Sequence, residues 1–316
     1  MQRQLHSELV DVAGSIAGWV RDVFDQIGSI SVPLLLLALG LHTCETLLNA
    51  FAWRNILAAA YPRGGAGFRP ILGAYGGGIA LNAILPAQAG TVAMLGLLRA
   101  QIRGSTVLGV VGAGVVQNAF FLLVGAVVCV VLVISRPAAF DLKAAWLTNY
   151  LLLGVGAVVV VAIVAWVLGR RFRDGLAAAQ EGAAILGTPR RYASQVLAVE
   201  VASYLVRMAV TTTFMYAYDV PVSARAVLLI TAVNSISTTF AATPGGVGTQ
   251  QALASVALRN YAPAHVVTAY SLGQQLILTA WDVVLGFVLL WSTLGWTATR
   301  HLVSREGPGH AGPRSS

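Results

Sequence analysis

Charged residues are scarce in this sequence. Asp, Glu, Lys and Arg together make up 10% of its 316 residues, whereas a soluble domain carries about 25%. Hydrophobic residues account for 57% of the chain, and the mean hydropathy is +0.76. A soluble fold of this composition would have to bury almost every helix on all sides. The composition therefore excludes an ordinary soluble domain and indicates a chain that has a lipid bilayer as its solvent.

Cysteine is also rare, with two in the whole chain. Cys44 and Cys129 both lie inside apolar runs, and no metal-ligand spacing joins them. They predict small buried hydrophobic side chains rather than a disulfide or a metal site. His42 and Glu45, three residues apart, predict a local hydrogen bond, because two ligands do not make a metal site. We expect neither a metal nor a cofactor.

The motifs of the common enzyme classes are missing. The chain has no Gly-x-Ser-x-Gly, no His-Glu-x-x-His and no phosphate-loop lysine, and only His42 of its five histidines lies clearly within an apolar run. These absences predict a protein that is not an enzyme. The net charge of +8 comes from arginines in short loops between apolar runs. Because those arginines do not form a soluble basic face, the pattern excludes nucleic acid as a partner.

Composition divides the chain into three parts. Residues 1–30 lack the apolar core of a cleavable signal, and their helical periodicity predicts an amphipathic helix lying in the membrane interface. Residues 31–294 predict a single transmembrane domain, and the polar, Gly-rich residues 295–316 predict a disordered tail. An arginine-containing loop is expected at 169–192. Membrane-spanning helices are expected at about 31–60, 105–134, 146–168, 193–217 and 264–294.

Two further apolar segments, 71–98 and 226–258, are interrupted by Gly and Pro. Each can cross the bilayer as one helix or form a re-entrant hairpin that enters and leaves on one side. If both are hairpins, twelve of the twenty Lys and Arg residues share one side of the membrane and six the other; simple crossings give ten and eight. Cytoplasmic loops carry the excess of Lys and Arg. The charge distribution thus favours two hairpins, a cytoplasmic C-terminus and an N-terminal helix on the outer face.

The two interrupted segments resemble each other. Each has an Asn upstream of Pro-x-x-x-Gly-Thr, and the favoured topology makes them enter from opposite faces, as an inverted repeat. Paired broken segments of this kind indicate a transporter binding site. Each proline ends one half-helix, and the free N–H groups that begin the next one suit an anionic headgroup. The expected binding residues are Asn82, Pro86, Gln88, Gly90, Thr91, Asn234, Thr243, Pro244, Gly245, Gly246, Gly248 and Gln251.

Ionisable residues inside the spans add three more candidates. A charge within the hydrocarbon costs about 2.5–3.5 kcal/mol on insertion scales, so it should face protein or water. Glu200 and Arg207 lie seven residues apart on one helical face, too far along the axis to pair directly. Asp282, midway along the last span, is the expected partner of Arg207. The three residues predict either a substrate or proton-coupling site or a structural network.

At Asn82 to Gly90 and Thr243 to Gly248, the chain resembles the transmembrane region of lysylphosphatidylglycerol synthases. This is a flippase-like family of integral membrane proteins from bacteria and archaea. The resemblance implies the flipping of aminoacylated phospholipids or the handling of lipid-linked sugars in envelope glycosylation. It gives no reason to expect lysyl transfer, because no soluble transferase domain follows. Positions that usually carry charge in the family hold neutral residues here, namely Gln88, Thr91, Met94 and Gln251.

Together these patterns predict an all-α polytopic membrane bundle with two opposed re-entrant hairpins in an inverted repeat. The expected function is flippase-like binding or translocation of a lipid-linked anionic substrate, a phospholipid or polyprenyl phosphate, in the inner (plasma) membrane of a bacterial cell. The expected partners are membrane lipids and a glycosyltransferase or lipid-modifying enzyme. Two alternatives stay open: a non-catalytic scaffold that presents lipid to a glycosyltransferase, and an intramembrane lipid transferase.

Overall fold

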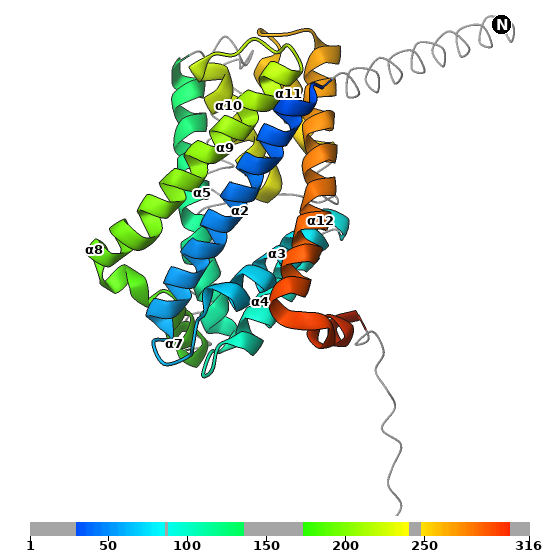
Figure 1. Cartoon of the computed structure of the whole chain (residues 1–316). Coiled ribbons are helices and arrows are strands. Elements are labelled where there is room, and N and C mark those ends of the chain that lie inside the picture. The colour runs from blue at the N-terminus through cyan, green and yellow to red at the C-terminus, as the bar shows by residue number, and fades with distance from the viewer. Residues whose placement is uncertain (1–29, 86–87, 136–172, 240–247, 304–316) are drawn as a thin grey trace, which may run out of the picture.

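The computed structural model describes residues 30–85, 88–135, 173–239 and 248–303 of the chain. Within these residues all regular structure is helical (Figure 1), as the sequence predicts. In the part of the chain that the structure describes, three helices are long and apolar enough to cross a membrane: Val32–Ala60, Pro189–Ala217 and Ala264–Thr293. The expected interfacial helix within 1–30 and the expected span at 146–168 lie outside the described residues.

The described helices follow one another along the chain in this order. They are α2 (Val32–Ala60), α3 (Phe68–Ile84), α4 (Ala89–Gln101), α5 (Val107–Ser135), α7 (Arg173–Gly182), η2 (Ala184–Gly187), α8 (Pro189–Tyr192), η3 (Ala193–Leu197), α9 (Ala198–Ala217), α10 (Ala224–Thr239), α11 (Thr249–Leu258) and α12 (Ala264–Val303). A proline stands in the first turn of both α2 and α8, where the missing N–H is not needed by the helix.

Three of the expected boundaries need correction. The segment expected to be a loop at 169–192 contains α7, η2 and α8, because its Ala-rich part favours a helix and α7 packs on α5. The span expected from 193 begins at Pro189 and passes through a π-helical turn, η3, before α9. The last helix continues through Val303, so the beginning of the expected disordered tail is helical.

Two apolar clusters hold the bundle together. One is built from α9, α10, α11 and the first half of α12 around Tyr218, Tyr270 and Phe214. The other is built mainly from α2, α3, α4 and α5 around Trp53 and Ile56. In Figure 1, α10 and α11 lie toward one end of the molecule and α3 and α4 toward the other. The helices α2, α9 and α12 connect the two ends.

Glycines let helices approach closely in the second cluster. A Cβ added to Gly286 of α12 would overlap the carbonyl oxygen of Gly76 of α3, and a Cβ added to Gly76 would lie 2.9 Å from the Cβ of Leu289. Small residues at such crossings let backbones touch in a membrane, where dispersion contacts replace the hydrophobic effect. The α3–α12 contact therefore fixes α3 against the longest of the described helices.

Helix α2 presents one polar and one apolar face. His42, Glu45 and Asn49 point inward, whereas Cys44 and Leu47 are exposed. The expectation that Cys44 is a buried side chain is wrong, because an apolar helix surface in a membrane is exposed to lipid rather than packed in a core. The side chain of Cys129 lies outside the described part of the structure.

Candidate functional site

A polar cavity of about 560 Å³ lies between the two apolar clusters. Side chains from α2, α3, α4, α5, α9, α10, α11 and α12 line it. Trp53 and Met94 of one cluster and Val210 of the other border it. Its polar lining includes His42, Glu45, Thr46, Asn49, Asn82, Gln88, Thr91, Gln117, Asn118, Arg207, Thr211, Asn234, Ser235, Gln250, Gln274, Gln275, Thr279 and Asp282.

The first interrupted segment contributes the α3–α4 pair. Helix α3 ends at Ile84 and α4 begins at Ala89, so the break falls where the sequence predicts it. The Asn82 side chain bridges the break: its Nδ2 donates to Thr91 Oγ1 at 2.9 Å, and its Oδ1 accepts from the Thr91 N–H at 3.0 Å. Gln88, at φ 60°, is the residue before α4. Asn82 therefore ties the end of one half-helix to the start of the next.

The second interrupted segment has a related arrangement. Asn234 of α10 accepts a hydrogen bond from Gln250 of α11 at 3.1 Å. Gly248, at φ 92°, precedes α11, and its N–H donates to the Gln251 side chain at 2.6 Å. Gln251 in turn donates to Gln275 of α12, a residue that lines the cavity. In both segments an upstream Asn thus bonds to the first turn of the helix that follows the break.

The helix starts are capped from within the protein. The sequence predicts free N–H groups here that would suit an anion, yet the N–H of Thr91 already bonds to Asn82 and that of Gly248 to Gln251. Packing alone requires Gly90 to be a glycine, because an added Cβ would overlap backbone atoms of Asn82 and Gly78. At each of these helix starts, one backbone N–H is thus bonded to a side chain of the protein.

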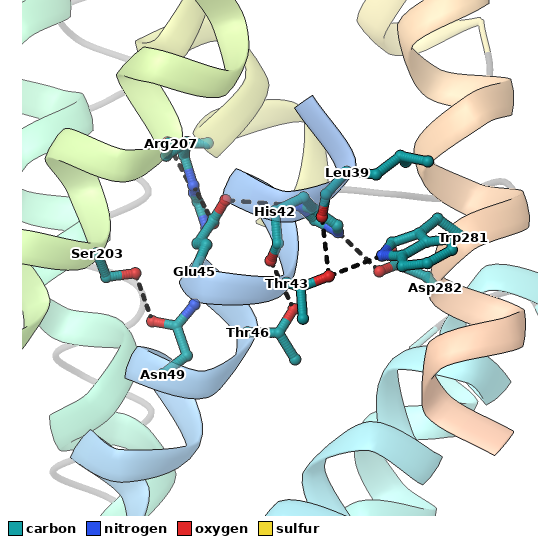
Figure 2. A network of polar contacts seen from close by, with 11 residues as sticks. Leu39, His42, Thr43, Glu45, Thr46, Asn49, Ser203, Arg207, Trp281 and Asp282 are labelled. Carbon is teal, nitrogen blue, oxygen red and sulfur yellow. Dashed lines mark hydrogen bonds and ion pairs between the residues drawn. The ribbon is translucent and has the colours of Figure 1, made fainter. Parts of the chain in front are cut away.

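Four ionisable side chains form a chain of contacts across the cavity (Figure 2). Asp282 Oδ1 lies 2.7 Å from His42 Nε2, and Glu45 Oε1 accepts from Arg207 Nε at 2.7 Å. His42 Nδ1 lies 3.6 Å from Glu45 Oε2, too far for a direct hydrogen bond. The contacts connect α12, α2 and α9. Among the described residues, no group of three or more His, Cys, Asp or Glu side chains is placed to share a metal ion.

The expected partnership between Arg207 and Asp282 is wrong. Arg207 pairs with Glu45, and Asp282 pairs with His42, because α2 lies between α9 and α12 and supplies a partner to each. Glu200 is fully buried and does not line the cavity, and its two carboxylate oxygens have no hydrogen-bond partner among the described residues. The structure therefore separates Glu200 from the other two predicted residues.

The remaining predicted residues fall into three groups. Those that line the cavity are Asn82, Gln88, Thr91, Asn234, Arg207 and Asp282. Those that support its wall from outside the lining are Gly90, Gly248 and Gln251. Those that lie outside the described residues are Pro86, Thr243, Pro244, Gly245 and Gly246. The two interrupted segments, distant in sequence, thus contribute to a single cavity.

Several lining residues were not predicted as site residues. His42, Glu45 and Asn49 recur at helical spacing on one face of the otherwise apolar α2, and this periodicity was the signal that could have identified them. Gln274 of α12 is another such residue. Its Oε1 and that of Gln117 are buried at the cavity without a hydrogen-bond partner among the described residues, so both amides can still accept a hydrogen bond.

Neutral amides are the commonest polar side chains of the cavity. Nine of its lining side chains are Asn or Gln, and the only Lys or Arg among the described lining residues is Arg207. An amide side chain both donates and accepts, so such a lining can satisfy a polar group without imposing a net charge. An aromatic ring also lies beside Arg207, whose Cζ is 4.9 Å from the centroid of the Phe121 ring. The cavity can therefore hold a polar headgroup and one anionic group near Arg207.

Comparison with known proteins gives one family. The family model described as "Lysylphosphatidylglycerol synthase TM region" matches residues 12–286 of the chain. No curated protein and no solved structure matches it. The match covers both interrupted segments and every described residue that lines the cavity.

Proposed function

The chain belongs to the lysylphosphatidylglycerol synthase transmembrane-region family of multi-pass membrane proteins, and from that premise we propose that it binds and translocates a lipid with an anionic headgroup. The observation that carries the proposal is the polar cavity into which both interrupted segments project Asn and Gln side chains beside Arg207. A phospholipid or a polyprenyl phosphate fits this description. The protein acts here as a flippase-like transporter rather than as an enzyme.

Arg207 is the proposed contact for the anionic group. Its guanidinium lies at the cavity with a side chain that is 26% exposed, and it is held by Glu45 and by the face of Phe121. A guanidinium binds phosphate through parallel hydrogen bonds and stays charged at all physiological pH values. The neutral Asn and Gln side chains around it would form hydrogen bonds with the rest of the headgroup without adding a charge of their own.

We further propose that α3–α4 and α10–α11 are re-entrant hairpins related as an inverted repeat. The Arg103 N–H donates to the Gly64 carbonyl at 3.1 Å, so the two ends of the α3–α4 pair lie together. Arg63, Arg69 and Arg99 near those ends are exposed, as expected at a membrane surface. In α10–α11 the Asn bridge and the positive-φ residue before the second helix recur.

A transport assay tests the proposed function. The purified full chain is reconstituted into vesicles that contain phosphatidylglycerol with a fluorescent label on one leaflet, and the label that reaches the other leaflet is measured with a membrane-impermeant quencher. We expect movement with the wild type and at least a tenfold slower rate with Arg207→Ala. Arg259→Ala, a change at an exposed arginine away from the cavity, should leave the rate unchanged.

Two results would contradict the proposal. One is a wild-type rate equal to that of protein-free vesicles; the other is an equal loss of rate with Arg207→Ala and Arg259→Ala. Native mass spectrometry of the purified protein adds an independent check, because the proposal requires a bound lipid that carries phosphate.

An intramembrane lipid transferase is the second candidate, and one observation favours it. The Asp282–His42 pair lies at the cavity in the arrangement by which a carboxylate orients a histidine that acts as general base. Such an enzyme would change the mass of a lipid without any partner protein, whereas a transporter leaves it unchanged. A scaffold for a glycosyltransferase would do neither alone and would co-purify with that enzyme.

Location is part of the proposal. We place the protein in the inner (plasma) membrane with its C-terminus in the cytoplasm and its N-terminal segment at the outer face, as the arginine distribution favours. A cysteine introduced at Ser316 should react with an impermeant maleimide only after the cells are opened.

A further inference from the structure

We infer that Glu45 is a built-in competitor for Arg207, and that an anionic ligand displaces it and thereby draws a proton into the cavity. This inference rests on the proposed function, because it concerns the same site. It adds a specificity-determining residue, Glu45, and a coupling between ligand binding and proton uptake.

The competition follows from the contacts of Arg207. Glu45 Oε1 accepts from Arg207 Nε at 2.7 Å, whereas the contact of Arg207 Nη1 with Ser235 Oγ is long at 3.4 Å. Glu45 is therefore the anion that the guanidinium already holds, and the Glu45 side chain is 8% exposed. A phosphate that approaches Arg207 would place a second negative charge against Glu45 in a low-dielectric cavity. One of the two anions must move away or be neutralised.

His42 provides the alternative partner for Glu45. It lies one helical turn before Glu45 on α2, its Nδ1 is 3.6 Å from Glu45 Oε2, and this nitrogen has no hydrogen-bond partner among the described residues. A small rotation of the Glu45 side chain would close that gap. His42 is itself fixed by Asp282 at 2.7 Å, so the ring need not move when Glu45 leaves Arg207.

The charge balance of the cavity gives the direction of proton movement. The ionisable side chains that face it are His42 and Glu45 from α2, Tyr75 from α3, Arg207 from α9 and Asp282 from α12, and the described lining residues of α4, α5, α10 and α11 are uncharged. A bound monoanion makes this group more negative by one charge. Uptake of one proton from water, onto the Glu45 carboxylate or the His42 ring, restores the earlier balance.

The coupling between proton binding and ligand binding determines whether the affinity for the anion rises or falls with pH. Because the liganded protein holds more protons than the free protein, the affinity for the anion should rise as the pH falls. One linked proton gives at most about a tenfold change in Kd per pH unit. A phosphodiester is a suitable probe, since it remains singly charged over the range in which histidine titrates, about pH 5 to 8.

Calorimetry measures the proton directly. The full chain in detergent is titrated with short-chain phosphatidylglycerol, and separately with dimethyl phosphate as a free phosphodiester, in two buffers that differ in ionisation enthalpy. The difference in heat gives the protons taken up per ligand bound. We expect about one proton per ligand and a Kd that falls with decreasing pH. Arg259→Ala, away from the cavity, should behave as the wild type does.

Two variants identify the residues that are responsible for the proton uptake. Glu45→Gln removes the competing charge, so the ligand should bind more tightly at the high end of the pH range. Glu45→Gln combined with His42→Gln and Asp282→Asn removes the imidazole and both carboxylates that face the cavity, so proton uptake should vanish while binding remains. Thermal unfolding establishes that each variant is folded, and the wild-type measurement in two buffers tests the inference even where a variant does not fold.

The outcomes separate this inference from the proposed function. If wild-type protein binds the lipid without proton uptake, or if folded Glu45→Gln binds it more weakly, the inference is wrong and the proposed function stands. If neither ligand binds, anion recognition at Arg207 is wrong and the inference falls with it. If only dimethyl phosphate binds, with proton uptake, the inference holds and the lipid assignment fails.

Discussion

The Glu45–Arg207 pair illustrates how strongly single residues matter in this protein. Glu45 is 8% exposed at its side chain, and Arg207 is the group that compensates its charge. Breaking a buried ion pair by removing one partner leaves the other charge without compensation. Removing both partners together lowers the unfolding free energy far less, so the single variants should be compared with the double variant.

The first prediction concerns this difference between removing one partner and removing both. Arg207→Ala should destabilise the protein by about 3 kcal/mol because it removes the cation hydrogen-bonded to the buried Glu45 carboxylate, and the double variant Glu45→Ala/Arg207→Ala should recover at least half of that loss. Equilibrium unfolding in detergent gives the four stabilities of the double-mutant cycle. Strictly additive effects would show that the two side chains do not interact.

For Glu200 we predict that removal of the charge has little effect on stability. It is fully buried on α9, away from the cavity, and neither carboxylate oxygen has a hydrogen-bond partner among the described residues. Glu200→Gln keeps the shape of the side chain and should therefore change the unfolding free energy by less than about 1 kcal/mol. Transport of labelled phosphatidylglycerol should also persist. A transport rate reduced as far as in Arg207→Ala would instead place Glu200 in the transport mechanism.

At the scale of helices, the sequence predicted which segments are helical better than it predicted where each helix begins and ends. Apolar length identified α2, α5 and α12, and Pro86 with its neighbouring glycines located the break between α3 and α4. The 169–192 segment was misjudged because its arginines suggest a loop, although its alanines favour a helix that packs on α5. Charge in a sequence indicates contact with water or headgroups, and it does not distinguish a loop from a surface helix.

The crossing of α3 and α4 gives a prediction with a control in the same helix. A Cβ at Gly90 would overlap backbone atoms of Asn82 and Gly78, whereas a Cβ at Gly96 would meet nothing within 4 Å. Gly90→Ala should therefore lower the unfolding free energy by about 1–3 kcal/mol, and Gly96→Ala should leave it unchanged or raise it by up to about 1 kcal/mol. Thermal unfolding of both variants provides the comparison. Equal stabilities would mean that the two half-helices do not cross this closely.

For the molecule as a whole, the site was less predictable than the fold. Asn82 and Asn234 were identified from their motifs, but that both line one cavity depends on the packing of eight helices. The partners of Arg207 and Asp282 could not be derived from spacing along one helix, because both partners stand on α2. Local patterns identify candidate residues, and only tertiary structure assigns their contacts.

The outward faces of α2 and α12 carry large apolar side chains. Exposed large hydrophobic side chains follow each other on α2 (Leu36, Leu47, Phe51) and on α12 (Val284, Phe287, Trp291). Exposure of this kind indicates a lipid-facing surface in a chain with spans of this length.

Cys44 tests that surface directly, because it is exposed on α2 close to Leu47. In a Cys129→Ser background, where Cys44 is the remaining cysteine of the chain, a lipid-soluble maleimide should label the reconstituted protein. A charged maleimide should label it at least tenfold more slowly. Equal labelling by both reagents would show that this face of α2 contacts water.

If α3–α4 is the re-entrant hairpin proposed above, the hydrogen bond between Arg103 and Gly64 has a consequence for biogenesis. A pair of helices that starts and ends at one point can be inserted by the translocation machinery without carrying any flanking segment to the far side. In that proposed arrangement the arginines beside those ends, Arg63, Arg69, Arg99 and Arg103, would stay on the side where they were synthesised. The α3–α4 pair can accordingly enter the membrane late, after its neighbouring spans have already fixed the orientation of the protein.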